Sequence, residues 1–438
     1  MLDPLYTADE MRAAEAGHDV DELMARAGRA VAEEALRRWP DARSFGAVCG
    51  KGANGGDARI ALEVLRSAGR EAKEGLGGDV VIDGLFGTGF RGEPRPDAAE
   101  LIERVNASGG PVLAVDLASG VDADTGEVEG VAVRADATVA MHGRKVGNVV
   151  APGRFHCGEV VVADIGLDAA ETDHRVVTRV ILGLVPRKRA EDNKYSAGHV
   201  LVVGGAPGTT GAASLSARAA LRADAGYVTV CCPRESLSVL ETLVVEAVKR
   251  PLDEVFEAAE RADALALGPG LGRSDERREL VRRLLAETDV PAVVDADALF
   301  GLEPVERAAA TVLTPHAGEL GRLLGEESSW VTAHRLEAAR RCAERFGCVC
   351  LLKGTDTLVA APGQGVLVVD AGPPTLATAG TGDVLTGVTA SFLAKGLEAR
   401  MAAAAASTAC GTAAWLGPPR GLVAGDVIAG LPEALDAI

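Results

Sequence analysis

The sequence predicts an α/β protein with two domains, each a mostly parallel sheet covered by helices on both faces. Short β-branched runs alternate with Ala- and Leu-rich amphipathic stretches, the pattern of parallel strands linked by helices. The chain has 438 residues, more than one ordinary core accommodates. The alternation weakens between Leu167 and Lys194, where a basic run indicates a solvated linker. We therefore expect an N-terminal domain at residues 1–175 and a C-terminal domain at residues 176–438.

The strands of both domains are expected at the β-branched runs. In the N-terminal domain a helical stretch over 8–38 precedes strands at 45–49, 80–83, 111–115, 137–140 and 160–163, with no strand between residues 69 and 79. In the C-terminal domain strands are expected at 199–203, 228–232, 265–267, 292–295, 311–314, 349–352 and 366–369. The uncharged stretch over 401–419 is too weakly apolar to span a membrane and predicts a buried helix.

Composition and charge exclude some classes of partner. Lys and Arg number 45 against 63 Asp and Glu, and aromatic residues make up only 3% of the chain. A net charge of −18 repels a phosphate backbone, and few rings are available to stack on bases, so nucleic acid is not an expected partner. The eight cysteines are scattered and form no CxxC pair, so a zinc site is not expected. The chain does not open on a signal peptide, with its charged start and apolar core, and we expect a soluble cytoplasmic protein.

A glycine-rich turn follows the first predicted strand. Gly50, Gly52 and Gly55 satisfy the pattern GxGxxG, and a helix is expected from Ala58. Backbone N–H groups in such a turn can bind phosphate, although a tight turn that needs small residues gives the same pattern. Because no strand with an acidic end is expected before Asp79, the sequence does not indicate ordinary hydride transfer with a dinucleotide.

Two aspartates end strands of the N-terminal domain. The loops after Asp83 and Asp116 are expected to converge on one crevice, because the carboxyl ends of parallel strands share an edge of the sheet. Asn54, Asp83 and Ser119 can then offer oxygen ligands to a hard cation, and Asp116 can exchange protons with a substrate. The alternative is that these aspartates only cap helices.

The clearest motif is Ala379-Gly-Thr-Gly-Asp383, which precedes a helical run. Thr381 is a good helix N-cap, and the glycines leave backbone N–H groups open to an anion at the positive end of the helix dipole. Asp383 in the first turn can take a proton from a hydroxyl that attacks phosphorus. A purely structural turn is the alternative.

Glycine and acidic motifs follow four other strands, at residues 267–272, 295–297, 314–319 and 352–357. Lys353 can hold nucleotide phosphates, and Gly354 lets the backbone approach them. Asp297 and Glu319 are candidates for water-mediated Mg²⁺ binding, with surface capping as the alternative for each. His316 lies at a strand end between a proline and a Gly-Glu turn, where a structural histidine is the alternative to a ligand contact.

The N-terminal motifs together resemble the epimerase domain of the NAD(P)H-hydrate repair enzymes. The resemblance covers about residues 1–170 and rests on Glu22–Gly28, Asn54–Asp57, Gly87–Glu93 and Asp116 with Ser119-Gly120. It implies a Rossmann-like three-layer sandwich, shortened between Gly69 and Val80, with Asp116 as a catalytic residue and potassium at Asn54, Asp83 and Ser119. The residues that it implies as contacts of the hydrated dinucleotide are Ala53, Asn54, Gly55, Gly56, Asp57, Gly87, Thr88, Gly89, Phe90, Arg91, Gly92, Glu93 and Asp116. The departures from the family pattern are Ala53, Ala58 and Ala118.

The C-terminal half is similar to the ribokinase-like fold, and within it to the nucleotide-dependent NAD(P)H-hydrate dehydratase domain. The resemblance spans about residues 176–438 and adds Asn193–Gly205, Thr210–Ala213, Ala219–Ala223 and Leu422–Leu435 to the strand-end motifs. It implies a three-layer sandwich with Asp383 as catalytic base, Mg²⁺, and ADP or ATP as co-substrate. The implied hydrate contacts are Ala213, Gly270, His316 and Asp383. The implied nucleotide contacts are Lys353, Gly354, Thr355, Asp356, Thr357 and Gly382. Ala317 and Asn193 depart from the pattern.

These resemblances imply a bifunctional repair enzyme for NADHX and NADPHX, with a homo-oligomer as a possible state. The N-terminal half would interconvert the R and S epimers. The C-terminal half would use ADP to dehydrate the S form to NAD(P)H and release AMP and phosphate. Two alternatives stay open. One is a ribokinase-like small-molecule kinase that uses the same base. The other is an active dehydratase whose N-terminal domain is not catalytic and only docks partners or stabilises the dehydratase domain.

Overall fold

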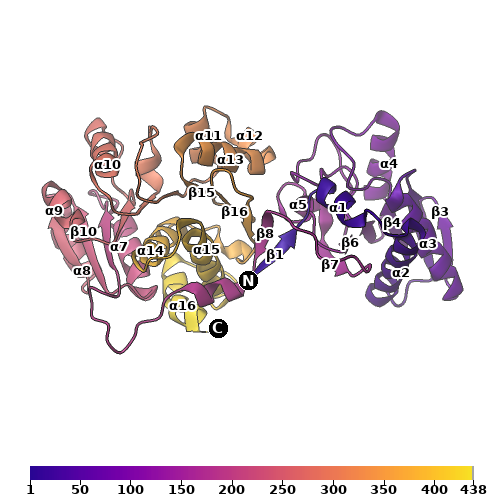
Figure 1. Ribbon diagram of the computed structural model, residues 1–438, viewed down its shortest axis with the longest axis horizontal. Helices are drawn as coiled ribbons and strands as arrows, with labels where there is room; N and C mark the ends of the chain where they lie inside the picture. Colours follow the sequence, from indigo (N-terminus) through magenta and orange to yellow (C-terminus); the bar gives the residue numbers. More distant parts are fainter. Residues whose placement is uncertain (437–438) are drawn as a thin grey trace. The chain divides into compact units, whose positions relative to one another are not determined.

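The computed structural model describes residues 1–436 and divides the chain into two compact units (Figure 1). The N-terminal unit comprises Pro4–Arg175 together with Thr332–Leu336. The C-terminal unit comprises Met1–Asp3, Val176–Val331 and Glu337–Ile438. Each unit combines a sheet with helices, which confirms the predicted α/β class with two domains.

The N-terminal unit is built on a six-stranded sheet in the order β3-β2-β4-β5-β6-β7, with every neighbouring pair parallel. Its strands are β2 (Ser44–Cys49), β3 (Glu71–Glu74), β4 (Val80–Gly84), β5 (Val112–Val115), β6 (Ala137–Met141) and β7 (Glu159–Ala163). Its helices are α1 (Ala8–Glu15), α2 (Val20–Arg38), α3 (Ala53–Ser67), α4 (Pro96–Asn106), α5 (Val146–Val149) and α6 (Arg154–Cys157).

Alternate residues of these strands face two helical layers, because successive side chains of a strand point to opposite faces. Phe45, Ile82 and Leu113 belong to a core that includes the buried sides of α2 and α3. Val48 and Ala114 belong to a second core with the apolar side of α4. The N-terminal unit is therefore a three-layer sandwich, as expected.

A short glycine crossover, residues 75–79, joins β3 to β4 without a helix. The prediction of no strand between residues 69 and 79 was wrong, because β3 pairs with β2 as an exposed edge strand. The crossover passes directly over β2. A Cβ on Gly46 would lie 2.2 Å from the carbonyl oxygen of Gly77, so only a glycine at position 46 lets the chain lie this close. Leu76 packs into the core on the α4 side.

Two helical predictions also need correction. The expected helix over residues 8–38 is split into α1 and α2, because Gly17 has a φ of 90° and Asp19 caps α2 by accepting the N–H groups of Asp21 and Glu22. The helix expected from Ala58 begins at Ala53. Residues 53–57 therefore form the first turn of α3 and not a free loop.

The C-terminal unit contains most of an eleven-stranded sheet in the order β1-β8-β17-β16-β15-β14-β13-β12-β9-β10-β11. In the part of the sheet that runs from β15 through β9 to β11, all neighbouring strands are parallel. In contrast, β16 is antiparallel to both β15 and β17. The strands are β1 (Leu2–Leu5), β8 (His174–Val177), β9 (His199–Val203), β10 (Tyr227–Cys232), β11 (Val248–Pro251), β12 (Ala264–Leu267), β13 (Ala292–Val294), β14 (Thr311–Leu313), β15 (Val349–Leu352), β16 (Thr357–Ala360) and β17 (Leu367–Val369). The boundary between the units passes through β1 and β8.

Helices cover both faces of this sheet in Figure 1. On one side lie α7 (Thr210–Arg222), α14 (Thr381–Ala394), α15 (Ala399–Trp415) and α16 (Ala424–Asp436), whose apolar residues form one core with the strands. The remaining helices are α8 (Leu237–Leu243), α9 (Val255–Ala259), α10 (Asp275–Glu287), α11 (Ala317–Leu324), α12 (Ser328–Ala333) and α13 (Arg335–Phe346). The stretch expected as a buried helix contains most of α15, which is mainly buried. None of the helices in residues 1–436 combines the length and apolarity needed to cross a membrane.

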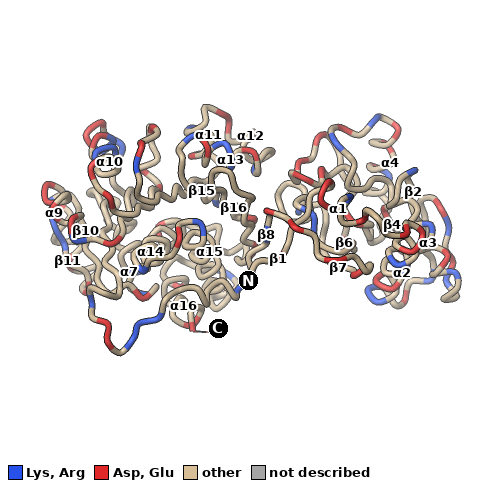
Figure 2. Tube along the Cα trace, in the orientation of Figure 1, with Lys and Arg blue, Asp and Glu red and all other residues tan. Residues whose placement is uncertain are grey.

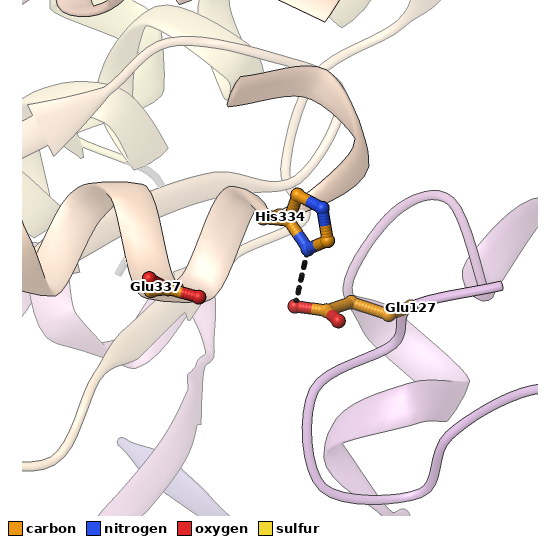
Figure 3. A group of neighbouring side chains, drawn as sticks. All are labelled: Glu127, His334 and Glu337. Atoms are coloured by element: carbon orange, nitrogen blue, oxygen red, sulfur yellow. Dashed lines mark ion pairs between the residues drawn. The ribbon is translucent and has the colours of Figure 1, made fainter. Parts of the chain in front are cut away.

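Acidic and basic residues lie close together on several helices in Figure 2, including α2 and α10. On α10, for example, Arg282 and Arg283 pair with Glu279 and Glu287. The segment Thr332–Leu336 adds a contact within the N-terminal unit, where Nδ1 of His334 lies 3.0 Å from the carboxylate of Glu127 (Figure 3).

Candidate functional site

In the N-terminal unit the chain adds β3 on one side of β2 and β4 on the other. The carboxyl ends of β2 and β4 therefore flank a topological switch point, the place where open α/β sheets bind ligands. The glycine turn follows β2, Asp83 lies near the end of β4, and Asp116 follows β5. The structure thus brings these predicted motifs to one edge of one sheet.

The glycine turn is packed too tightly for most side chains. A Cβ on Gly50 would lie 2.0 Å from the carbonyl oxygen of Leu85, and one on Gly55 would lie 2.1 Å from the carbonyl oxygen of Gly50. These two glycines meet a packing requirement, which was the alternative interpretation of the motif. Gly52 differs, because a Cβ there would meet nothing within 4 Å. It is the N-cap of α3 and leaves that helix end uncovered.

Asn54, Asp83 and Ser119 gather around the turn that follows β4. Nδ2 of Asn54 donates to the carbonyl oxygens of Val115 at 2.5 Å and Phe86 at 3.2 Å. The carboxylate of Asp83 is fully buried and accepts from the hydroxyl of Ser119 at 2.7 Å and from its N–H at 2.8 Å. Burial raises the pKa of Asp83, and the hydrogen bonds from Ser119 oppose this.

These three side chains fit a monovalent cation. Among residues 1–436, no Lys or Arg forms an ion pair with the buried carboxylate of Asp83. Because Nδ2 of Asn54 is engaged with two carbonyl groups, its amide oxygen is left as an acceptor beside Gly87. Carboxylate, amide and hydroxyl oxygens are ligands for hard cations, and a cation would supply the missing positive charge.

Asp116 has a different environment. It has a φ of 67°, in the left-handed region, and its carboxylate accepts from the N–H of Met141 at 2.8 Å and from the ammonium group of Lys145. Lys145 is fully buried and also donates to the carbonyl oxygens of Met141 at 2.7 Å and Gly143 at 3.0 Å. The ammonium group therefore provides the counter-charge for Asp116 and fixes its direction.

Asp57 lies in the first turn of α3, only 5% exposed, with a buried Oδ1 that has no hydrogen-bond partner. Burial raises the pKa of Asp57 to about 7, and the charges of Asp116 and Glu15 act in the same direction. Burial also raises the pKa of Glu15 on α1, with a further contribution from Asp116. Three acids thus interact at this end of the sheet, and only Asp116 holds a buried ammonium group.

The loop from Gly87 to Glu93, including Thr88, Gly89 and Gly92, lies next to these groups. A Cβ on Gly87 would lie 2.5 Å from the amide oxygen of Asn54. The ring of Phe90 stacks on that of Phe86 with 4.5 Å between centroids. Arg91 pairs with Asp122 at 3.2 Å and with Asp124, which ties this loop to the loop that follows β5.

In the C-terminal unit a cavity of about 390 Å³ lies at the ends of β14 and β15. Its volume is in the range of small-molecule sites. Six of the predicted site residues line it: His316, Lys353, Gly354, Thr355, Thr357 and Gly382. An apolar part of the lining comes from Ala371–Pro374, Leu376 and Ala377, and from Cys410 and Gly411 on α15. Predicted hydrate and nucleotide contacts thus share one cavity.

Asp383 lies in the first turn of α14, next to this cavity. Burial raises its pKa to about 7; the charges of Asp295, Asp297 and Glu319 add to this effect, and Lys353 opposes it. A carboxyl group that titrates near neutrality is well suited to act as a general base.

Thr381 is not the N-cap of α14 as expected. Gly380 occupies that position with a φ of 89°, which favours glycine, and no side chain caps the helix. The hydroxyl of Thr381 instead lies 3.0 Å from the carbonyl oxygen of Leu376 and 2.9 Å from that of Thr378. The helix end is therefore left open by glycine, while Thr381 holds the preceding loop.

Lys353 is fixed by acidic neighbours. Its ammonium group lies 2.8 Å from Oδ1 of Asp295 and 3.7 Å from Oε2 of Glu319. Burial alone would lower the pKa of Lys353, but Asp295 and Glu319 raise it above its usual value. The hydroxyl of Thr386 on α14 lies 2.7 Å from the other oxygen of Asp295. This network connects the ends of β13 and β15 to the helix that carries Asp383.

The side chains of His316, Glu319 and Asp297 have structural partners. Nδ1 of His316 caps α11 by accepting the N–H of Gly318 at 3.0 Å, and Glu319 completes the capping box. Asp297 accepts the N–H of Gly272 at 2.9 Å and pairs with an arginine, Arg273, at 2.7 Å. Capping, the alternative given for Glu319, is present, and His316 has the structural role given as its alternative. Asp297 caps no helix and instead binds the loop before α10. Magnesium binding by Asp297 and Glu319 stays a prediction.

Besides Asp383, three predicted site residues do not line the cavity. Ala213 is fully buried in α7, and Asp356 is 1% exposed. Gly270 has a φ of 60° and faces Thr209, whose carbonyl oxygen would lie 2.5 Å from a Cβ at that position. The ligand contacts of these residues stay predictions.

Lys145 and Asp295 were not predicted as site residues. Lys145 lies between β6 and β7, and nothing in the local sequence marks its charge as buried. Asp295 ends a strand beside Asp297, but its partner Lys353 is 58 positions away, so the pairing could be seen only after β13 and β15 were placed in one sheet.

Two family models match the chain: one described as NAD(P)H-hydrate dehydratase at residues 200–422, and one described as YjeF-related protein N-terminus at residues 20–76 and 70–147. The bifunctional NAD(P)H-hydrate repair enzyme of Coxiella burnetii is 35% identical, with 95% of each chain covered. That of Moorella thermoacetica is 36% identical, with 94% of this chain and 92% of its own covered. A crystal structure of ADP/ATP-dependent NAD(P)H-hydrate dehydratase from Bacillus subtilis with ATP and Mg²⁺ matches with a TM-score of 0.55 and 26% identity, over 59% of this chain and 97% of that chain. These findings confirm the resemblance of both halves.

Proposed function

The chain belongs to the family of bifunctional NAD(P)H-hydrate repair enzymes, and we propose that each half performs one of two reactions on NADHX and NADPHX. Residues 1–175 would form the epimerase domain, which interconverts the R and S hydrates. Residues 176–438 would form the dehydratase domain, which uses ADP to convert the S hydrate to NAD(P)H. The observation that carries this proposal is Asp383, whose pKa of about 7 places a general base beside a cavity that also holds Lys353.

The dehydratase reaction requires a better leaving group than hydroxide. Asp383 would accept the proton of the substrate hydroxyl while its oxygen attacks the terminal phosphorus of ADP and AMP departs. The electrons of the ring nitrogen would then expel phosphate and regenerate the reduced nicotinamide. Lys353, with residues 354–357 and Gly382, would hold the nucleotide phosphates in line for attack. Mg²⁺, for which Asp297 and Glu319 are the candidate residues, would neutralise charge on the phosphates.

The epimerase half would use Asp116 as its catalytic residue. Residues 53–57 at the start of α3 and the loop of residues 87–93 would bind the hydrate. Asn54, Asp83 and Ser119 would hold K⁺, which would place a positive charge near the substrate's phosphates. The open first turn of α3, with its uncapped N–H groups, suits the same phosphates.

The proposal is tested by absorbance recovery in the reduced-nicotinamide band from mixed R and S epimers of NADHX with ADP, Mg²⁺ and K⁺. Rapid recovery of both epimers is expected, relative to a control with an epimerase-free dehydratase that reports spontaneous epimerisation. Recovery of one epimer, with the other at the control rate, would exclude epimerase activity. No nucleotide-dependent recovery, or a stable phosphorylated product, would favour the small-molecule kinase.

Potassium binding is expected to stabilise the N-terminal unit. The unfolding temperature of the chain should be higher in KCl than in choline chloride at equal ionic strength, because a ligand that binds only the folded state stabilises it. Asp83→Asn should abolish this difference, since it removes the buried carboxylate. Asp97→Asn, at an exposed position on α4, should keep it. An equal K⁺ effect in Asp83→Asn would contradict the assignment.

A further inference from the structure

Two buried carboxyl groups of the N-terminal unit interact electrostatically, but they differ in their hydrogen-bond donors. The carboxylate of Asp116 is held by Lys145 and by the N–H of Met141. Asp57 interacts electrostatically with Asp116, yet its buried Oδ1 has no hydrogen-bond partner. Glu15 on α1, an exposed residue, adds a further negative charge nearby. One acid thus has two donors on its Oδ1, and the other has an unmatched buried oxygen.

The unpaired carboxyl of Asp57 has no structural explanation. A buried polar atom without a partner destabilises a fold, so such atoms are rare in native proteins and recur at functional sites. The surrounding turn is otherwise packed closely, as Gly50 and Gly55 show. Asp57 caps no helix and forms no ion pair among the described residues. Its position beside the switch point places it at the crevice of the proposed epimerase.

We propose that Asp57 is the proton donor of the epimerase reaction, that Asp116 is the matching proton acceptor, and that Lys145 is the positioning residue that holds the carboxyl group of Asp116 in place. This inference rests on the proposed epimerase function and deepens it. Only one of the two carboxyl groups has an ammonium group beside it.

The proton balance of this scheme closes. Asp57 gives its proton to the hydroxyl on the hydrated ring carbon, the C–O bond breaks, and water leaves with the bonding electrons. The lone pair of the ring nitrogen forms a C=N bond and leaves a cationic imine. A water molecule then adds to the other face of that carbon and loses a proton to Asp116. Transfer of this proton from Asp116 to Asp57 restores the starting state.

The protonation of Asp57 sets a pH dependence. Burial, with Asp116 after β5 and Glu15 on α1, raises the pKa of Asp57 to about 7, while Lys145 faces Asp116. A proton donor acts only when protonated. The epimerase rate, after subtraction of the spontaneous rate, should therefore fall as the pH rises above about 7.

The test uses the full chain and measures kcat and KM for epimerisation across this pH range. Asp57→Asn should lower kcat by about 10²-fold or more, which is the contribution of a general acid, and should remove the fall at high pH. Asp57→Glu should recover part of the rate. Glu63→Gln, at an exposed position on the same helix, should behave as the parent. Dehydration of the pure S epimer by the other unit should be unchanged, and the K⁺-dependent shift in unfolding temperature should show that the crevice is intact.

The outcomes separate this inference from the proposed function. A parent chain that epimerises only at the spontaneous rate would exclude epimerase activity itself. An active parent with an Asp57→Asn variant that keeps kcat and the same pH profile would overturn the donor assignment. A rise in KM alone would also overturn it, because it would show that Asp57 only binds substrate. Lys145→Met should change the pH profile as well as kcat; a purely structural lysine would leave the profile unmoved.

Discussion

Replacing Asp383 with Asn is expected to lower kcat for ADP-dependent dehydration by about 10²–10⁴-fold, the usual range for removal of a general base. The amide keeps the shape of the side chain in the first turn of α14 but cannot accept the hydroxyl proton. ADP affinity should change little, since Lys353 and the neighbouring residues of the cavity are intact. Steady-state rates and calorimetric binding of ADP measure the two effects separately. Asp275→Asn, with an exposed carboxylate, is the matched control.

The same assignment fixes the pH profile of the parent. Asp383 acts only when it is ionised, and its pKa is raised to about 7. The dehydration rate should therefore rise with pH through about 7 and be lost on acidification, the opposite direction to the epimerase rate. A flat profile in the parent, or an active Asp383→Asn variant, would contradict the role of Asp383.

Loss of activity in Asp383→Asn should not come from unfolding. The folded state binds the proton of Asp383 more tightly than the unfolded chain, because the pKa rises from 3.8 to about 7 on folding. Ionisation of Asp383 therefore costs stability as the pH rises between these values. The Asn variant should unfold at a higher temperature than the parent at alkaline pH, and this gain should disappear below about pH 4.

Replacing Lys353 with Met is expected to weaken ADP binding by about 10- to 100-fold, the effect of losing one charge-assisted hydrogen bond to phosphate. It should also destabilise the C-terminal unit, because the carboxylate of Asp295 is 2% exposed and would lose its counter-charge. Removal of one partner of a buried ion pair typically costs about 3–5 kcal/mol. The pKa of Asp383 should rise further, because Lys353 lowers it.

A double variant separates these effects of Lys353. Asp295→Asn combined with Lys353→Met removes both charges, so the free energy of unfolding should recover much of its loss. ADP affinity should stay low, because the phosphate contact is still missing. Full recovery of ADP affinity in the double variant would show that Lys353 only neutralises Asp295.

Strand ends and their motifs could be predicted from the sequence because they are local. The Gly-Thr-Gly-Asp383 turn, the Lys353 turn and the strand-end aspartates of both halves each occupy a few consecutive residues. The expected parallel sheets then place these turns at one edge without further information. The family comparisons confirm the fold and the two halves that those motifs indicated.

Features that depend on packing were missed or misplaced. β3 has the sequence Glu-Ala-Lys-Glu, whose exposed residues carry no signal for a strand, and it forms only because the edge of β2 is free to pair. Lys145 was missed because its partners are contributed by segments after β5 and β6. The start of α3 was placed too late because the small residues 53–57 suit either a turn or a helical first turn.

The glycine crossover of residues 75–79 also bears on the order of folding. Parallel strands usually pair through a crossover of a dozen or more residues, whose closure costs entropy. Here β2, α3, β3 and β4 all come from residues 44–84, so β2 finds both neighbours within one short stretch of chain. Contacts of low sequence separation form early. This segment is thus suited to form first, and the crevice that it builds would be in place before the strands that carry Asp116 and Lys145 are added.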